Sequence, residues 1–310
     1  MAQSTEKPIK QEYTGTDFEV RCCDTNELRN KLETTLYDMA AKNGWPAGYG
    51  HVTFSSLIDP EGNYVGLLNG EIVSMISAVN HNDKFAFIGT FMTFDEHQGK
   101  GFGTKVFNAS IAHCGDRVIG LYAAPHMTEW YKRQGFAQTG TASIYRKQNP
   151  EKLPLPEGYN PAYIIPLKDV DFKEVLNFDR RYFPADREKF LHAWLTHPKV
   201  TSALVYVKDG VIHGYGALRK CIGDKWCKFG PLFADSLNVA EQLAVAMINA
   251  LPEGIEYVQF DCLDDNPSVK ALAEKLNFPV TPYGGAVLYK NGVPEFDVSG
   301  VYAYTSGAFG

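Results

Sequence analysis

Three closely spaced glycines, Gly99, Gly101 and Gly103, stand between a strongly apolar run and a helix-like pattern. Glycine has no side chain, so it turns the chain tightly and leaves backbone N–H groups open to a ligand. A loop of this kind at the start of a helix attracts anions, because the first N–H groups of the helix have no partner within it. We therefore predict that Gln98–Thr104 binds a phosphate-like group. A glycine-rich turn without a ligand is the alternative.

Two common phosphate-binding loops do not fit this stretch. The dinucleotide pattern G-x-G-x-x-G requires a third glycine where Thr104 stands. The P-loop pattern requires Lys before Ser or Thr, whereas Thr104 here precedes Lys105. A phosphate loop at this place is therefore of another type.

Patterns on both sides of the loop predict how it is positioned. Residues 85–94 are nearly all apolar or β-favouring, as in a strand with both faces buried. After the loop, Val106, Phe107 and Cys114 lie on one face of a predicted helix, which Gly115 ends. The loop is thus expected to join a buried strand to an amphipathic helix.

Together with a second stretch, the loop resembles the GNAT superfamily of N-acetyltransferases. Motif A of that family, [QR]-x-x-G-x-[GA], is matched by Gln98, Gly101 and Gly103. A helix ending like L-Y-x-x-x-G-F is matched by Trp130–Phe136, with Trp in the Leu position. The two motifs also lie at the separation usual in the family. The resemblance implies an α/β (α+β) fold with a central mixed β-sheet flanked by helices.

The resemblance also implies that acetyl-CoA binds as co-substrate, with no metal. In the family the loop holds the pyrophosphate, and a bulge in the preceding strand places its backbone beside the acyl group. Gly89 would allow that bulge. The implied acetyl-CoA contacts are Phe91, Met92, Thr93, Gln98, Gly99, Lys100, Gly101, Phe102, Gly103 and Thr104.

Tyr131 matches the helix tyrosine that protonates the departing CoA thiolate in the family. A phenol with a pKa of about 10 can supply that proton. The alternative is a core aromatic residue with a wet hydroxyl.

The general base is unassigned, because residues 85–94 contain no Asp or Glu. His126, Glu129, Glu61 or a chain of water molecules remain open, and His51, His81 and His97 receive no role.

Composition sets broad limits. A length of 310 residues suggests two domains, and 45% hydrophobic with 21% charged residues is usual for a globular protein. The net charge of −6 argues against a nucleic-acid partner and mildly favours a neutral or cationic acceptor. The six cysteines lack metal-ligand spacing, and no apolar run is long enough to span a membrane. We predict reduced thiols, no metal, no membrane contact and a cytoplasmic location.

The chain divides into segments by composition. Residues 1–16 are polar and predicted to be mobile, 17–148 form the predicted catalytic domain, and 149–161, with four prolines, form a linker. Residues 162–310 repeat the organisation of the first half. The hairpin turns Asn69-Gly70 and Asp209-Gly210 correspond, and so do the helix ends Trp130–Phe136 and Leu272–Phe278.

The second copy lacks the chemical residues of the first. Residues 234–240 hold no glycine, and Ala273 stands where Tyr131 does. The chain resembles a two-domain, tandem GNAT group with an active N-terminal and a degenerate C-terminal domain. Tandem copies can pack as an internal pseudo-dimer, so we expect a monomer.

Two places are predicted to contact the acceptor. The aromatic loop that begins at Trp45 either lines an acceptor pocket or covers the edge of the core. A charge cluster that includes Asp179 either closes the acceptor end of the cleft or is a solvated face with a helix cap at Asp186.

These features predict an acetyl-CoA-dependent N-acetyltransferase. The acyl group would pass to a primary amine of a small molecule or amino acid, by direct attack in a ternary complex. A catalytically weak acyl-CoA-binding sensor or scaffold is the alternative, which the missing strand carboxylate allows.

Overall fold

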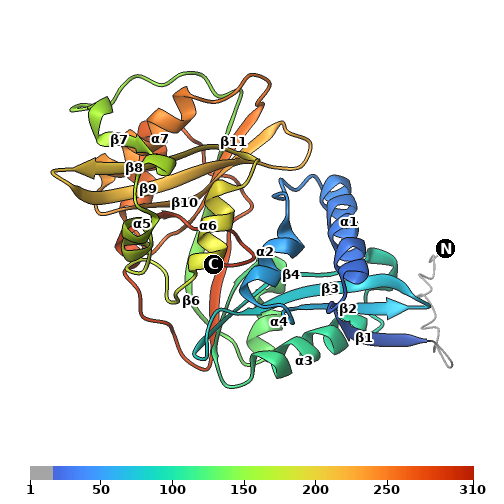
Figure 1. Ribbon diagram of the computed structural model, residues 1–310. Coiled ribbons are helices and arrows are strands. Elements are labelled where there is room, and N and C mark those ends of the chain that lie inside the picture. Colours follow the sequence, from blue (N-terminus) through green and yellow to red (C-terminus); the bar gives the residue numbers. More distant parts are fainter. Residues whose placement is uncertain (1–16) are drawn as a thin grey trace, which may run out of the picture.

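The computed structural model describes residues 17–310, so the predicted mobile segment 1–16 lies outside the described residues. Two lobes, one mainly from each half of the chain, meet at the centre of the molecule (Figure 1). The first half contains β1 (Phe18–Cys22), α1 (Asn26–Asn43), α2 (His51–Ile58), β2 (Asn63–Leu68), β3 (Glu71–Asn80), β4 (Phe85–Thr93), α3 (Phe102–Cys114), β5 (Val118–Ala123), α4 (Thr128–Arg133) and β6 (Ala137–Gln148).

The second half repeats this alternation of strands and helices. It contains β7 (Ile164–Pro166), α5 (Phe172–Asp179), α6 (Glu188–Thr196), β8 (Val200–Lys208), β9 (Val211–Lys220), β10 (Trp226–Ala234), α7 (Leu237–Asn249), β11 (Tyr257–Leu263), α8 (Ser268–Leu276), β12 (Gly285–Lys290) and β13 (Val301–Ala303). Short 3-10 helices cover Asp95–His97, Pro125–Met127, Pro161–Tyr163, Leu167–Asp169 and Val298–Gly300. The predicted mixed sheet with flanking helices is confirmed.

One mixed sheet runs through both halves. Its strand order is β1-β2-β3-β4-β5-β12-β6-β11-β10-β9-β8-β7, and β13 pairs with β10. The pairs β4–β5 and β10–β11 are parallel. These two parallel pairs occupy corresponding places in the two halves, which agrees with a repeat.

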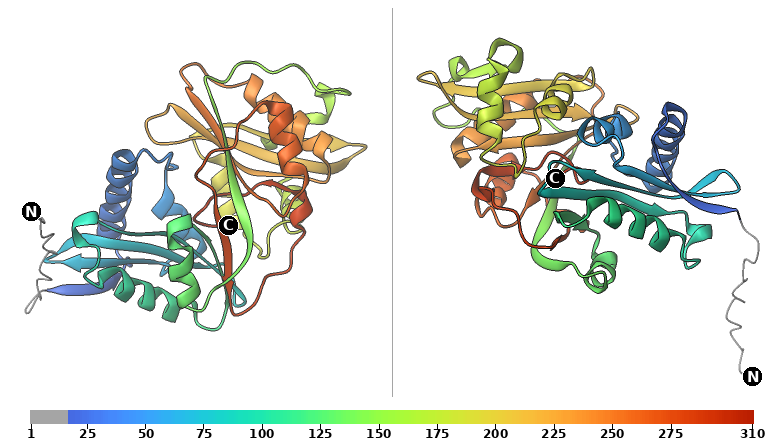
Figure 2. Two further views of the ribbon diagram at one scale, coloured as in Figure 1. Left: turned by 180° about the vertical axis from the view of Figure 1, so that it is seen from behind. Right: turned by 60° about the horizontal axis from the view of Figure 1, so that its bottom comes forward.

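The two halves exchange a strand at the centre. β12 comes from the second half, yet it pairs antiparallel with β5 on one side and with β6 on the other. β6 in turn pairs with β11 of the second half. Figure 2 shows β6 in green and β12 in red side by side between the lobes. The predicted boundaries at 148 and 162 therefore do not separate two independent sheets.

Local signals in the sequence form the expected turns. Asn69 and Gly70 have φ of 52° and 81°, and Asp209 and Gly210 have φ of 52° and 75°. Both pairs thus make the left-handed two-residue turn that fits the twist of a hairpin. Asn277 ends α8 in the left-handed conformation with φ 56°.

Aromatic side chains from both halves form a shared core. Phe54 of α2 packs edge-on against Trp194 of α6 at 4.9 Å between ring centroids. Phe309, which is fully buried, packs against Phe190 at 5.5 Å. Apolar burial on this scale stabilises the contact between lobes by the hydrophobic effect. The core therefore fixes α2 of the first half against α6 of the second.

Candidate functional site

The strand β4 separates from β5 part of the way along its length. The two strands pair only from Phe85 to Ile88. Against β3, Ser77 pairs with Gly89 and Met75 with Met92, so β4 contains one extra residue between these pairs. Thr90 within this bulge has φ 53°. A β-branched residue in the left-handed region is strained, and such strain is frequent at functional sites.

Gly89 has a different role from the expected one. A Cβ at this position would collide with the backbone of Ala308 in the C-terminal segment. The glycine therefore permits close approach of that segment, while Thr90 takes up the unusual backbone angle of the bulge.

The glycine loop leaves the N-terminus of α3 open. Gly99 and Gly101 have φ of 72° and 82°, and a Cβ on either would meet nothing within 4 Å. Gly101 is the N-cap residue, and within residues 17–310 α3 has no side-chain cap hydrogen bond. The first N–H groups of α3 are thus available to an anion. A Cβ on Gly103 would lie 2.6 Å from Thr93 Oγ1, so this glycine lets α3 approach β4.

Two further loop residues, Gln98 and Phe102, fasten the loop to the strands beside it. Gln98 Nε2 donates to Thr93 O at 3.2 Å and to Asp95 Oδ1 at 3.1 Å. The Phe102 ring is buried and stacks on Phe18 at 4.3 Å, so Phe102 offers its backbone rather than its side chain to a ligand. Lys100 and Thr104 are exposed. The residues present fit a phosphate-bearing group such as the pyrophosphate of an acyl-CoA.

Tyr131 lies beside the bulged strand. Its ring packs against Phe91 of β4 at 6.3 Å and Phe107 of α3 at 6.0 Å. Gly135 follows α4 with φ 89°, and Phe136 N donates to Tyr131 O at 3.2 Å. Burial raises the pKa of the Tyr131 phenol well above its usual value, so the hydroxyl keeps its proton at neutral pH. The structure thus brings Tyr131, Phe91 and the glycine loop together.

His51, which received no role from the sequence, contacts the bulge directly. Its Nε2 lies 2.6 Å from Thr90 Oγ1, and Ser77 Oγ donates to Thr90 Oγ1 at 3.5 Å. Burial lowers the pKa of His51 to about 4, so its imidazole is neutral at physiological pH. The only available signal was its position directly after the aromatic loop 45–50.

The bases that the sequence left open lie on the protein surface. Glu129 is exposed and pairs with Lys132 at 2.8 Å on α4. His126 is exposed in the preceding 3-10 helix, and Glu61 is exposed beside Cys22, whose thiol donates to Glu61 O. His51 is the histidine that reaches the bulge.

The two predicted acceptor positions differ in the structure. Trp45 is 46% exposed and begins a loop that docks on the second half, where Ile222 N donates to Ala47 O at 2.9 Å. Asp179 is fully buried and accepts from Arg187 Nε at 2.9 Å and Nη2 at 2.7 Å, and also from the Tyr215 hydroxyl. This saturated carboxylate is not on a surface that an acceptor reaches, because a buried charge needs its partners to remain inside.

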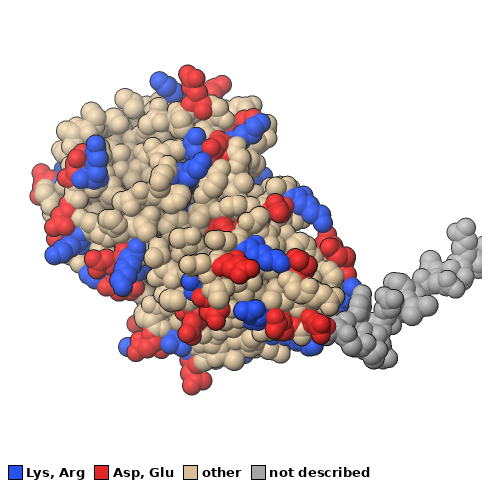
Figure 3. Space-filling view, turned by 45° about the vertical axis from the view of Figure 1, so that its right-hand side comes forward, with Lys and Arg blue, Asp and Glu red and all other residues tan. Residues whose placement is uncertain are grey.

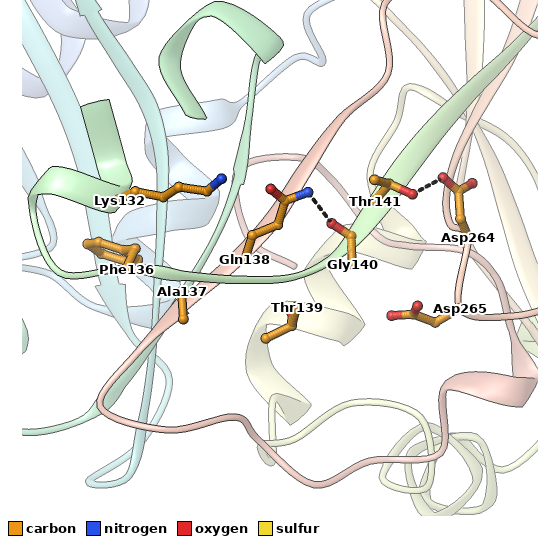
Figure 4. A pocket seen from close by; sticks show the side chains of 9 residues that line it. All are labelled: Lys132, Phe136, Ala137, Gln138, Thr139, Gly140, Thr141, Asp264 and Asp265. Atoms are coloured by element: carbon orange, nitrogen blue, oxygen red, sulfur yellow. Dashed lines mark hydrogen bonds between the residues drawn. The ribbon is translucent and has the colours of Figure 1, made fainter. Parts of the chain in front are cut away.

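Lys and Arg are interspersed with Asp and Glu on the face in Figure 3. A shallow hollow at the strand exchange is lined by Gln138, Thr141 and Asp264, and Thr141 donates to Asp264 (Figure 4).

Within residues 17–310, no His, Cys, Asp and Glu side chains gather in a way that could hold a metal ion. None of the helices in that range has the length and apolar character needed to cross a bilayer.

The bulged strand, the open helix N-terminus and the mixed sheet are those of an acyltransferase of the GNAT type, and family comparisons agree. A model described as "Acetyltransferase (GNAT) family" matches residues 26–136, and one described as "Acetyltransferase (GNAT) domain" matches residues 175–299. The chain belongs to the GNAT acetyltransferases and carries two GNAT domains in tandem.

Individual relatives are similar over most of the chain. Holothin acyltransferase from a Pseudoalteromonas strain is 27% identical over 219 residues, which cover 71% of this chain and 72% of that protein. A putative acetyltransferase from Pyrococcus horikoshii has the same fold with a TM-score of 0.76 at 19% identity, covering 99% of this chain and all of the other. A tandem GNAT protein from the clavulanic acid biosynthesis pathway has a TM-score of 0.61 at 14% identity and covers 90% of this chain and all of its own.

Proposed function

We propose that the protein is an acetyl-CoA-dependent N-acetyltransferase that acts on a primary amine of a small molecule or amino acid. The observation that carries this proposal is the uncapped N-terminus of α3 beside a β4 strand that has separated from β5. An acyl-CoA bound there would direct its pyrophosphate to the loop and its thioester to the bulge. The acyltransferase relative supports the class of reaction.

The loop and the bulge would divide the work of binding. Backbone N–H groups of residues 101–104 would neutralise the pyrophosphate, since Gly101 leaves them unobstructed. The backbone of Phe91, Met92 and Thr93 would run along the acyl arm. A backbone N–H near Met92 or Thr93 would stabilise the negative charge that develops on the carbonyl oxygen.

His51 would accept the proton of the acceptor amine through Thr90. A neutral imidazole with Nε2 at 2.6 Å from Thr90 Oγ1 can take the hydroxyl proton as the hydroxyl takes one from the amine. The lowered pKa of His51, about 4, keeps the base form populated above mildly acidic pH. Tyr131, which stays protonated, would donate to the departing thiolate.

Thiol release from acetyl-CoA tests the function. We expect release with some members of a panel of amines, amino acids, amino sugars and polyamines. His51→Gln should lower kcat by about 10²-fold, within the range of general base catalysis, while acetyl-CoA affinity is retained. His126→Gln, which changes an exposed histidine next to α4, is the matched control and should be unaffected.

Two results would contradict the proposal at different levels. Tight acetyl-CoA binding without release for any amine would favour the acyl-CoA sensor or scaffold instead. Release that depends on His126 and not on His51 would leave the acyltransferase in place and remove the proton path through Thr90.

A further inference from the structure

Arg219 of β9 is a buried cation without an anionic partner. The residue is 4% exposed, and its Nε and Nη2 are both shielded from solvent without a hydrogen-bond acceptor. The guanidinium stacks on the Trp194 ring at 3.5 Å and lies 4.8 Å from the Phe54 ring. Among residues 17–310, no Asp or Glu forms an ion pair with it, although eleven other ion pairs are present.

Arg187 in the same lobe is a buried arginine whose Nε and Nη2 do have an acidic partner. Its Nε and Nη2 donate to the two carboxylate oxygens of Asp179 at 2.9 and 2.7 Å. Arg187 also stacks on an aromatic ring, that of Phe183, at 3.8 Å. The two arginines therefore share burial and stacking and differ in the carboxylate. The unoccupied edge of Arg219 has the fork geometry that matches a carboxylate.

Electrostatics agree with this difference. Burial lowers the pKa of Arg219 to about 9, and the groups that oppose this shift are the Cys221 thiol and the Tyr37 phenol rather than a carboxylate. Arg219 and Lys199 both act on His197, whose pKa is lowered mainly by its own burial. Lys199 is compensated by Asp224 at 3.0 Å, so Arg219 is the cation of this group that lacks an acidic neighbour. An uncompensated buried charge is costly, and a ligand anion would remove that cost.

Arg219 lies close to the proposed acceptor end of the site. Phe54, which it faces, is one helical turn after His51 on α2. α2 and α6 meet where the two lobes join (Figure 1), and Arg219 stacks on α6 through Trp194. The loop 45–50 is bridged to the segment after β9, with Gly48 paired to Cys221 and Gly223 N donating to the Tyr49 hydroxyl at 3.3 Å. Arg219 is thus connected through Phe54 to the helix that carries His51, and the segment after it is connected to the aromatic loop.

We propose that Arg219 binds an acidic group of the acceptor, so that the acceptor is an amine that also carries a carboxylate. This inference rests on the proposed function and narrows its substrate class to amino acids and related amino acid-like molecules. This inference differs from the expectation based on net charge, which favoured a neutral or cationic acceptor. A buried cation in direct contact with the ligand attracts a carboxylate more strongly than the dispersed net charge of −6 repels it, because the interaction energy of two charges falls with distance. Since the fork is shielded in the resting structure, binding includes a turn of the guanidinium off Trp194 or a shift of loop 45–50.

Matched acceptor pairs test this inference with acetyl-CoA as donor. Each pair contains an L-amino acid and its carboxamide, which have the same side chain, and kcat/KM is expressed per unprotonated amine because the carboxamide lowers the pKa of the α-amine. The unmodified protein should favour the acid by about 10- to 100-fold in kcat/KM, mainly through KM, as expected for a charge-assisted hydrogen-bonded pair. In Arg219→Met this ratio should fall to about one, and Arg219→Lys should restore it in part because the charge is kept without the fork.

Arg146→Met is the matched control. Arg146 also stacks on a tryptophan, Trp226 at 4.6 Å, but its Nε and Nη2 donate to Gln259. Its loss should leave the ratio of acid to amide unchanged. If Arg219→Met does not fold, the wild-type protein gives the answer through thermal melting. The acid should then raise Tm in the presence of CoA, and the carboxamide should not.

The outcomes separate this inference from the function beneath it. Thiol release with amines but without preference for the acids, or equal stabilisation by acid and carboxamide, would overturn the role of Arg219 and leave the acetyltransferase intact. No release with any amine, despite acetyl-CoA binding, would instead contradict the proposed function. A preference that survives in Arg219→Met would assign the carboxylate to another residue.

Discussion

The two halves have the same strand geometry but differ in what lies between their two parallel strands. In the first, β4 and β5 pair only over Phe85–Ile88, and in the second, β10 and β11 pair only over Trp226–Lys228. Each central strand also has a one-residue register shift against its antiparallel neighbour, after Gly89 in β4 and between Phe229 and Leu232 in β10. Both copies therefore open a gap between parallel strands, as the repeat predicts.

The gap in the second half is filled by the chain itself. β13 pairs with β10 at Leu232 and Phe233, and Tyr304 N donates to Asp261 O of β11 at 3.0 Å. The helix that follows β10 is capped by its own serine, since Ser236 Oγ accepts from Val239 N at 3.4 Å. The chain itself thus occupies this gap, and one N–H group at the start of α7 already has a side-chain partner. The comparison therefore predicts that the repeated strand geometry alone does not make an acyl-CoA site.

The C-terminal segment links the two gaps. A Cβ on Gly230 would collide with Thr305 O, just as a Cβ on Gly89 would collide with Ala308. Phe309 then packs against His51 at 4.9 Å between ring centroids. Residues 301–310 fill one gap and support the wall of the other, so the second half supports the site of the first.

The largest expected effect follows from placing a bulky side chain in the loop. Gly101→Val should weaken acetyl-CoA binding by at least about 100-fold, because the side chain would stand over the N-terminus of α3 and obstruct the backbone approach. Gly210→Val is the matched control, since Gly210 also has positive φ, 75°, and open space around it. Both variants should lose about 1–3 kcal/mol of stability from backbone strain. Calorimetry in which both bind acetyl-CoA equally would show that the loop is not the site.

A smaller effect on rate is expected from Tyr131→Phe. The variant keeps the ring among Phe91, Phe107 and Phe136 and loses only the hydroxyl, so Tm and acetyl-CoA affinity should change little. Turnover should fall by about 100-fold, the lower end of the range for general acid catalysis, because a thiolate is a good leaving group. Tyr206→Phe in the second half is the control. Unchanged turnover under conditions where chemistry limits the rate would remove Tyr131 from the mechanism.

The smallest expected effect concerns the hydrogen bond between His81 and the C-terminal segment. His81 Nε2 donates to Phe309 O at 3.0 Å, while its Nδ1 is buried without a partner. Burial, and then the charge of Arg187, lower the pKa of His81 to about 3, against the opposing effects of the hydrogen bond to Phe309 and of Asp59. The unfolded chain takes up this proton below about pH 6.5 and the folded chain does not, so stability is lost as pH falls from about 6.5 towards 3.

His81→Gln tests that pH dependence. The amide nitrogen of Gln can still donate to Phe309 O, but the side chain does not titrate. At pH 5 the wild-type protein should have lost about 1–2 kcal/mol through this histidine that the variant retains. Denaturant unfolding at pH 7 and pH 5 measures the difference. Equal slopes with pH in the two proteins would place the acid sensitivity elsewhere.

Local features of the sequence predict much of this structure. The hairpin turns, the left-handed ends at Gly135 and Asn277, and the strand, loop and helix around Gly101 depend on neighbouring residues alone. The repeat between the two halves is visible in the sequence because the same turn and helix-end signals occur in both. Family motifs then added the bulge and Tyr131, which lie together in the structure although they are distant along the chain.

The remainder depends on long-range pairing. The apolar run 285–290 reads the same whether its strand pairs within its own half or between β5 and β6. A lone histidine such as His51 gives no sign that Thr90 is its partner. Arg219 stands next to Lys220 and after apolar residues, which indicates a strand end and not a buried cation. Asp179 lies in a charged run, yet Arg187 and Tyr215 enclose it only once the helices pack.

Titration calorimetry of the full chain with acetyl-CoA tests the central claim most directly. The open loop in the first half and the filled gap in the second predict one molecule bound per chain, and this binding should disappear in Gly101→Val and persist in Ser236→Gly. Two sites of similar affinity, or one site that survives Gly101→Val, would contradict the account. Two sites would mean that β13 leaves the gap in the second half on binding. A site that survives Gly101→Val would mean that acetyl-CoA uses a different surface.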